Sequence, residues 1–228
     1  MSLPRVKVCG LTRANDVEAA LFAGADALGF VLHAPSPRSV SPGAAADLCR
    51  VVGDRARTYL VLVDGEAGEV EGLRRATGAS GVQLCGAQRP RDFASFRGEM
   101  LIRLNADENA LERAEAWRPV LEQSLGRGFV LEPPGFVGGS GRPVDLEQAR
   151  LLAAQLPCLL AGGLTADNVA ERIARTSARG VDASSGLELS HGIKDPVRLT
   201  RFVRSGRRAL DALDRAKAQT PKPFPQAS

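Results

Sequence analysis

The stretch from residue 157 to residue 186, PCLLAGGLTADNVAERIARTSARGVDASSG, contains one complete unit of the fold. It begins with an apolar run at 157–161, continues with a helix-patterned segment at 166–178 and ends with a second short run, GVDA, at 180–183. A continuous apolar run is typical of a strand that is buried on both faces, as in a parallel sheet. The stretch therefore predicts a strand, a helix and a second strand parallel to the first.

The same pattern recurs along the chain ahead of this stretch. Strands are predicted at 5–9, 26–31, 57–63, 81–84, 100–104, 128–132, 157–161 and 180–183. Helices are predicted between them at 15–23, 42–52, 66–76, 90–97, 107–124, 145–156 and 166–178. Eight such units match a compact (β/α)8 barrel, or TIM barrel, whose usual length starts at about 200 residues. Periodicity alone does not show that the eighth strand pairs with the first, so an open doubly wound sheet is the alternative.

Both ends of the chain fit one α/β domain. Asn15 is the expected N-cap of the first helix, and Ser41 precedes a proline at the first position of the second. A C-terminal amphipathic helix is predicted from about Pro196, and the proline-rich ending TPKPFPQAS predicts disorder. We expect a single TIM barrel domain over residues 1–217 and a disordered tail over residues 218–228.

The composition excludes several classes of protein. The chain is 44% apolar and 25% charged, as in ordinary globular proteins, and no apolar run approaches the roughly 18 residues that span a bilayer. The N-terminus lacks the pattern of a secretory signal, so a cytoplasmic location without membrane contact is expected. The net positive charge lies entirely within residues 194–228, which carry nine Lys or Arg and three Asp, and aromatic residues make up only 4% of the chain. This pattern predicts a solvated helix face and no nucleic-acid binding.

The cysteines do not form a metal-binding pattern. Cys9, Cys49, Cys85 and Cys158 are far apart, and no Cys-x-x-Cys or Cys/His cluster occurs. The sequence therefore predicts no metal site, and in a cytoplasmic protein no disulfide.

Small residues follow the last three predicted strands. They are Gly139, Ser140 and Gly141 after the sixth, Gly162 and Gly163 after the seventh, and Ser184, Ser185 and Gly186 after the eighth. Barrel active sites lie at the C-terminal ends of the strands, and phosphate sites there typically use the last loops. Short loops of this kind direct backbone N–H groups toward an anion. The pattern predicts a phosphate site and a small phosphorylated substrate.

Six segments resemble the phosphoribosylanthranilate isomerase family of tryptophan biosynthesis. They are 7–12 (KVCGLT), 24–31 (GADALGFV), 36–38 (SPR), 82–84 (VQL), 160–164 (LAGGL) and 180–186 (GVDASSG). The resemblance runs in order from residue 5 to about residue 204. It implies an Amadori rearrangement of N-(5'-phosphoribosyl)anthranilate to 1-(2-carboxyphenylamino)-1-deoxyribulose 5-phosphate. No cofactor is expected, because proton transfer within one substrate requires none.

The resemblance also implies roles for single residues. Cys9 matches the base that removes the C2' proton, and Glu132 aligns with the acid that protonates the furanose ring oxygen. Because the thiolate is the reactive form, Cys9 is expected to be exposed in an electropositive mouth, and a buried structural thiol is the alternative. Arg38 matches the residue that binds the anthranilate carboxylate, unless it is a solvated loop charge. Asp182 matches a carboxylate that contacts substrate, unless it caps the turn that follows.

The chain departs from the family at two positions. Glu132 stands where the family has an Asp, and Cys85, included among the substrate-binding residues, stands where the family has a His. The two histidines, His33 and His191, are expected to be loop residues rather than catalysts. One rival hypothesis is an aminoaldose isomerase of histidine biosynthesis, but that class typically has an Asp on the first strand, where this chain has Cys9. The other is a non-catalytic barrel of altered specificity that keeps the phosphate site. The sequence does not predict an oligomeric state.

Overall fold

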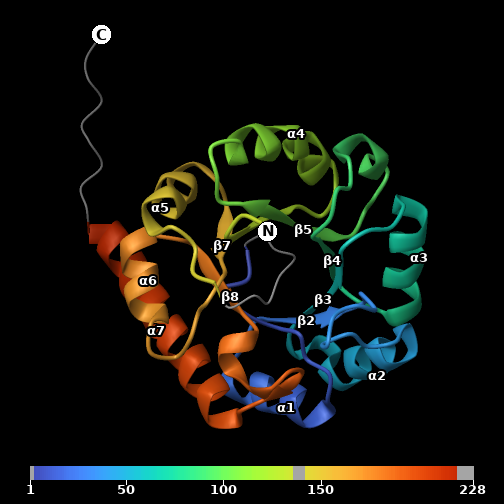
Figure 1. Cartoon of the computed structure of the whole chain (residues 1–228), viewed down its shortest axis with the longest axis horizontal. Coiled ribbons are helices and arrows are strands. Elements are labelled where there is room, and N and C mark those ends of the chain that lie inside the picture. Colours follow the sequence, from blue (N-terminus) through green and yellow to red (C-terminus); the bar gives the residue numbers. More distant parts are fainter. Residues whose placement is uncertain (1–2, 136–141, 220–228) are drawn as a thin grey trace.

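Eight parallel strands close into a barrel in the computed structural model, which describes residues 3–135 and 142–219 (Figure 1). The strands are β1 (Val6–Cys9), β2 (Ala27–Val31), β3 (Arg57–Leu62), β4 (Gly81–Leu84), β5 (Glu99–Asn105), β6 (Arg127–Glu132), β7 (Cys158–Leu160) and β8 (Gly180–Ala183). β8 pairs with β1 in parallel, with Lys7 opposite Asp182. The predicted TIM barrel is therefore confirmed, and the open sheet was the wrong alternative.

Within the described residues, seven α-helices form a ring outside the strands (Figure 1). They are α1 (Ala14–Ala23), α2 (Pro42–Val52), α3 (Ala67–Thr77), α4 (Ala110–Gln123), α5 (Leu146–Gln155), α6 (Val169–Thr176) and α7 (Pro196–Gln219). α7, the predicted C-terminal amphipathic helix, packs against α1 and α6 (Figure 1). Of the predicted tail, residues 218 and 219 are instead the end of α7, and residues 220–228 lie outside the described part of the chain. None of the described helices is long and apolar enough to cross a bilayer.

The structure decides two predicted helix caps and one predicted helix. The Ser41 side chain accepts a hydrogen bond from the backbone N–H of Ala44, so its role as N-cap of α2 is confirmed. Asn15 was the wrong cap for α1, because the helix begins one residue earlier and Arg13 occupies the cap position without a side-chain bond. Residues 90–97 form only a short 3₁₀ turn at Pro90–Phe93 instead of the predicted helix.

A short hairpin after β8 was not predicted. β9 (Glu188–Ser190) and β10 (Ile193–Lys194) follow β8 and precede α7 in the chain, and they pair in antiparallel orientation. The hydroxyl of Thr12, in the loop after β1, donates a hydrogen bond to the carbonyl of Gly192 in the hairpin turn, at 2.6 Å. The hairpin is thereby attached to the β1 end of the barrel.

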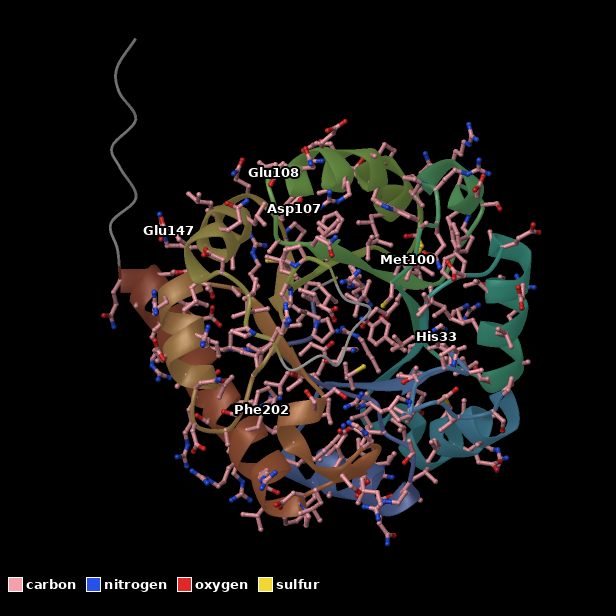
Figure 2. All side chains as sticks on the ribbon, viewed as in Figure 1. His33, Met100, Asp107, Glu108, Glu147 and Phe202 are labelled. Atoms are coloured by element: carbon pink, nitrogen blue, oxygen red, sulfur yellow. The ribbon has the colours of Figure 1, made fainter. Side chains whose placement is uncertain are left out.

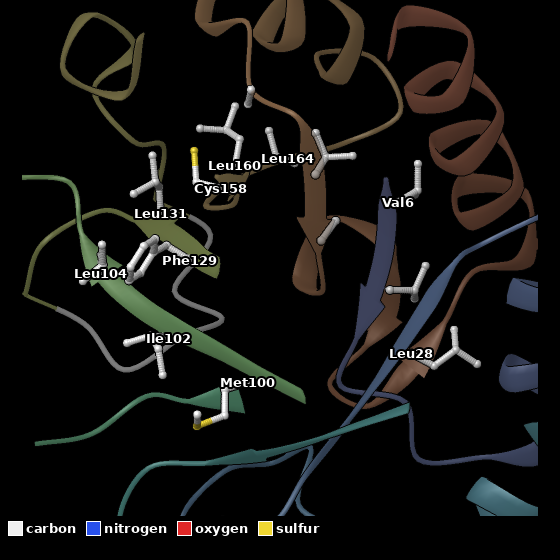
Figure 3. Packing of buried hydrophobic residues seen from close by; sticks show 14 of the residues in the cluster. Val6, Leu28, Met100, Ile102, Leu104, Phe129, Leu131, Cys158, Leu160 and Leu164 are labelled. Carbon is white, nitrogen blue, oxygen red and sulfur yellow. The ribbon is translucent and has the colours of Figure 1, made fainter. Parts of the chain in front are cut away.

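Alternate residues of the strands serve two separate cores. Outward-facing side chains such as Val6, Leu28 and Met100 pack between the barrel and the helices (Figure 3). Inward-facing residues, among them Ala27, Tyr59, Leu101, Val130 and Leu159, fill the barrel interior. Burial of both faces explains why most strands are continuously apolar.

Charged groups occupy the N-terminal end of the barrel. The carboxylate of Glu99 accepts hydrogen bonds from the Tyr59 hydroxyl at 2.6 Å and from Arg127 Nε at 3.0 Å. All three residues are buried, and their polar groups satisfy one another. The opposite end of the barrel holds the cavity described next.

Candidate active site

A cavity opens at the C-terminal ends of the strands. Its lining comes from every strand end except that of β5: Cys9, Val31, His33, Ser36, Arg38, Val61, Val63, Gln83, Cys85, Glu132, Pro133, Ala161, Gly162, Gly163, Leu164, Asp182, Ala183, Ser184, Ser185 and Gly186. All the described residues that the sequence predicted for the site line this cavity. The other predicted residues, Gly139, Ser140 and Gly141, lie outside the described part of the chain. His33, labelled in Figure 2, was predicted to be a loop residue rather than a catalyst and lies on this lining. His191 is not one of the lining residues given above.

Cys9 faces the cavity beside a buried ion pair. In the alternation of β1, Val6 and Val8 point outward, and Lys7 and Cys9 point inward. Lys7 Nζ donates a hydrogen bond to Asp182 Oδ2 on the neighbouring strand, at 2.8 Å. Gly29, which is opposite Cys9 in the sheet, leaves the necessary room, since a Cβ there would lie 2.8 Å from Cys9 Sγ and 3.2 Å from Lys7 Nζ.

The Cys9 thiol is buried rather than exposed, and only 9% of the residue is accessible. This corrects the expected exposure, although the expected positive surroundings are present. Burial raises the pKa of Cys9, and the nearby charges of Lys7 and Lys194 oppose that rise only in part. Burial alone would lower the pKa of Lys7, but the charges of Asp182 and Cys9 outweigh it, so the pKa of Lys7 lies above its ordinary value. The site therefore keeps a fixed ammonium charge next to a thiol.

Glu132 ends β6 and also points into the cavity. Its side chain is 12% exposed, and its Oε2 accepts a hydrogen bond from Arg103 Nε of β5 at 2.8 Å. Burial raises the pKa of Glu132, although Arg103 favours the ionised form. The carboxyl group can therefore hold a proton at a higher pH than an ordinary glutamate.

Cys85 follows β4 and is a different kind of thiol. Burial together with the charge of Glu132 raises the pKa of Cys85 to about 12, and Gln83 Nε2 donates a hydrogen bond to its sulfur at 3.4 Å. The main charge acting on Cys85 is thus a carboxylate, which favours the neutral thiol, whereas the main charge acting on Cys9 is the ammonium of Lys7, which favours the thiolate.

Two buried oxygens on the lining are ready to accept hydrogen bonds. Gln83 Oε1 and Asp182 Oδ1 receive none from the residues that the structure describes. Buried polar atoms are normally paired, so an unpaired acceptor in a cavity marks where a ligand donor can bind. Hydroxyl and amine groups are donors of this kind.

Arg38, in the loop after β2, is buried and ion-paired rather than solvated. Its Nε and Nη2 donate hydrogen bonds to the two carboxylate oxygens of Glu188 on β9, both at 2.8 Å. Lys194 Nζ donates to Glu188 Oε1, also at 2.8 Å. Burial opposes ionisation, but these two cations hold the pKa of Glu188 below its ordinary value.

The loops after β6, β7 and β8 approach one another closely at the rim. Gly162 and Gly163 adopt φ angles of 91° and 62°, which favour glycine. A Cβ on Gly162 would lie 2.7 Å from Cδ of Pro133, and one on Gly186 would overlap the carbonyl of Leu164. Larger residues would therefore push apart the loops whose backbone N–H groups line the cavity.

Sequence reasoning missed five polar residues around the cavity: Lys7 as an ion-pair partner, Gln83, Arg103, Glu188 and Lys194. The first three carry a signal, because each is a polar residue between two apolar neighbours of a buried strand. Glu188 and Lys194 lie on strands too short to show periodicity. The described residues hold no cluster of His, Cys, Asp and Glu suited to a metal ion.

Comparison with known proteins shows which family has this sequence and fold. A sequence model of the N-(5'-phosphoribosyl)anthranilate isomerase family matches residues 6–205. The isomerase of Thiobacillus denitrificans is 38% identical over 205 residues, covering 87% of this chain and 96% of the relative. The isomerase of Halorubrum lacusprofundi is 37% identical over 219 residues, covering 92% and 99%.

Solved structures agree in fold. The phosphoribosyl anthranilate isomerase of Thermus thermophilus superposes with a TM-score of 0.76 at 28% identity, covering 92% of this chain and 99% of that one. A further isomerase, 24% identical with a TM-score of 0.76, was solved in complex with reduced 1-(o-carboxyphenylamino)-1-deoxyribulose 5-phosphate, and the match covers 90% of this chain and 99% of that one.

Proposed function

This chain belongs to the N-(5'-phosphoribosyl)anthranilate isomerase family, and we propose that Cys9 and Glu132 act as base and acid in its reaction. The activity is the isomerisation of N-(5'-phosphoribosyl)anthranilate in tryptophan biosynthesis. The observation that carries the proposal is that the Cys9 thiol and the Glu132 carboxyl line the same cavity from different strand ends.

The cavity offers a separate site for each end of the substrate. The backbone N–H groups of Gly162, Gly163, Ser185 and Gly186 would hold the 5'-phosphate, as late loops of this fold typically do. Arg38, at another part of the lining, would hold the anthranilate carboxylate through its planar guanidinium. An isomerase of the same fold was solved with an analogue that carries both a phosphate and a carboxylate, the two groups for which these sites are proposed.

The reaction proceeds through ring opening, formation of an enolamine and its conversion to the aminoketose, each with its own proton transfer. Glu132, in its neutral form, would donate a proton to the furanose ring oxygen, and the C1'–O bond would break to give an open iminium ion. The Cys9 thiolate would then remove the C2' proton. The electron pair of that C–H bond would form a C1'–C2' double bond and neutralise the iminium nitrogen. The enolamine becomes the aminoketose when a proton reaches C1' and the C2' hydroxyl loses its own.

Polar neighbours prepare both groups for these tasks. Lys7 would stabilise the thiolate by charge, and Asp182 would hold Lys7 in place through their 2.8 Å hydrogen bond. The acceptors Asp182 Oδ1 and Gln83 Oε1 would bind donors of the substrate, such as the ribose hydroxyls.

Removal of each thiol in turn tests the base assignment. Loss of anthranilate fluorescence on freshly made substrate gives the rate. We expect Cys9→Ala to lose at least about 10²-fold in kcat with little change in affinity, because a base acts mainly in the transition state. Cys85→Ala is the matched control and should be far milder. Equal losses in both variants, or full activity in Cys9→Ala, would refute the assignment.

A further inference from the structure

The buried carboxylate of Glu188 holds Arg38 by one particular edge. Glu188 accepts hydrogen bonds from Nε and Nη2, both at 2.8 Å. A guanidinium has five N–H groups, and these two form its side edge. The end edge, made by Nη1 and the second hydrogen of Nη2, points away from Glu188. Two parallel donors on that edge match a second carboxylate.

Lys194 joins this pair to the loop after β8. Its Nζ donates to Glu188 Oε1 at 2.8 Å and lies 3.2 Å from the carbonyl oxygen and 3.3 Å from the hydroxyl of Ser184. The side chain is 1% exposed, and its backbone N–H is held by Asp16 Oδ2 at 3.1 Å. One buried ammonium thus contacts both the partner of Arg38 and a residue of the phosphate-site rim.

Gly10 allows Arg38 and Ser184 to come together. A Cβ at this position would lie 2.6 Å from Cδ of Arg38 and 2.7 Å from the Ser184 hydroxyl. Gly10 has a φ of 70° and directly follows Cys9. The arginine, the serine and the end of β1 therefore pack against one another as one rigid group.

The charges of this group leave a place for one more anion. Arg38 and Lys194 both pair with Glu188, the anion between them. Burial lowers the pKa of Lys194 and the charge of Glu188 opposes that fall, so the charge count that follows is for the protonated ammonium. The excess of one positive charge is buried, where an unpaired charge is costly. A substrate carboxylate on the end edge of Arg38 would balance it.

We propose that Glu188 and Lys194 are positioning residues that fix the spacing between the carboxylate-binding and phosphate-binding groups. This inference rests on the proposed role of Arg38. The pair makes the cavity selective for a substrate that carries both anions, because Arg38 presents its end edge at a set distance from the phosphate loops. The β9–β10 hairpin, which lies outside the eight barrel strands, is therefore part of the substrate-recognition apparatus.

Two ligands, two variants at the proposed pair and one control variant test the inference. The first ligand is reduced 1-(o-carboxyphenylamino)-1-deoxyribulose 5-phosphate, and the second is the same molecule without its carboxyl group. Their dissociation constants are measured by titration calorimetry on the full chain and on Glu188→Gln. Glu147→Gln is the matched control, because Glu147 also pairs with an arginine, Arg150, but on the exposed surface of α5.

Glu188→Gln should weaken the carboxylated ligand by about 10-fold or more, the scale of a charge-assisted hydrogen bond. The dissociation constant of the ligand without the carboxyl group should change by less than about 2-fold, as for a substitution that removes no contact with the ligand. Glu147→Gln should alter neither. Equal weakening of both ligands in Glu188→Gln would indicate general structural damage and overturn the inference. Unchanged or tighter binding of the carboxylated ligand would overturn it as well. The loss of repulsion between Glu188 and the ligand carboxylate would then outweigh any loss in the positioning of Arg38.

Lys194→Met tests the connection to the phosphate loop. It should weaken both ligands, since Nζ contacts Ser184 as well as Glu188. If the ligand without the carboxyl group still binds as in the wild type, Lys194 does not support the phosphate site, and that part of the inference is wrong. A wild-type chain that isomerises its substrate but does not prefer the carboxylated ligand would instead refute the role of Arg38. A wild-type chain without isomerase activity would refute the proposed function itself.

Discussion

Cys9 and Glu132 must carry opposite protonation states at the moment of reaction. The productive state has a thiolate on Cys9 and a neutral carboxyl on Glu132. Burial raises both pKa values, that of Glu132 above 4.5 and that of Cys9 above 9.0. Below the pKa of Glu132 both groups hold protons, and above the pKa of Cys9 neither does. We therefore expect a bell-shaped kcat/KM profile, with Glu132 setting the acid limb above pH 4.5 and Cys9 the alkaline limb above pH 9.0.

Lys7→Met should move the alkaline limb of that profile most, and the acid limb less, because the ammonium charge is the main neighbour lowering the pKa of Cys9 and a minor one lowering the pKa of Glu132. Without the ammonium charge the Cys9 thiolate is less stable, so the pKa of Cys9 rises and the limb shifts to higher pH. Lys217→Met, at the exposed end of α7, is the control and should leave both limbs in place. A lower rate with an unchanged alkaline limb would mean that Lys7 has a purely structural role.

The length of the Glu132 side chain is matched to its surroundings. Glu132→Gln should lower kcat by at least about 10²-fold, because an amide cannot donate the proton that a carboxylic acid donates. Glu132→Asp should also be impaired, since the shorter side chain withdraws its carboxyl from Arg103 Nε, now 2.8 Å away. The fluorescence assay gives both rates. A tolerated Gln would show that Glu132 is not the acid, and a faster Asp variant would show that the native chain is a weakened isomerase.

At the scale of elements, the sequence predicts structure well wherever burial imposes a pattern. The eight strands follow from apolar runs, because each strand is covered on both faces. The hairpin of β9 and β10 shows no such pattern, since its strands have three and two residues and its Leu189 is exposed. Residues 90–97 have a helical pattern, yet the chain makes one 3₁₀ turn there, and Phe93 and Phe96 pack into the outer core instead.

The two predicted helix caps give a matched pair for a stability test. Ser41 accepts a hydrogen bond from the Ala44 N–H, so Ser41→Ala should lower the free energy of unfolding by about 1 kcal/mol. Asn15 lies inside the first turn of α1 and is not its cap residue, so Asn15→Ala should change it by less than about 0.5 kcal/mol. Urea unfolding followed by circular dichroism measures both values. A larger loss for Asn15→Ala would contradict the assignment of the caps.

At the scale of the whole molecule, the cavity combines residues that are far apart in the chain. Arg38 and Cys9, which the resemblance to a known family singled out, both line the cavity. The resemblance did not provide Glu188, which is 150 positions from Arg38, or the burial of Cys9 beside Gly29. Those facts depend on the closed barrel and on the loops packed across it, which periodicity along one strand does not encode.

A crystal structure with reduced 1-(o-carboxyphenylamino)-1-deoxyribulose 5-phosphate tests the central claim most directly. The account predicts the phosphate on the backbone N–H groups of Gly162, Gly163 and Gly186 and the carboxylate on Arg38. It also predicts C2' within about 3.5 Å of Cys9 Sγ, the separation of a reactive pair. A phosphate bound elsewhere, such as among the arginines of α7, or a Cys9 sulfur beyond proton-transfer reach of C2', would contradict it.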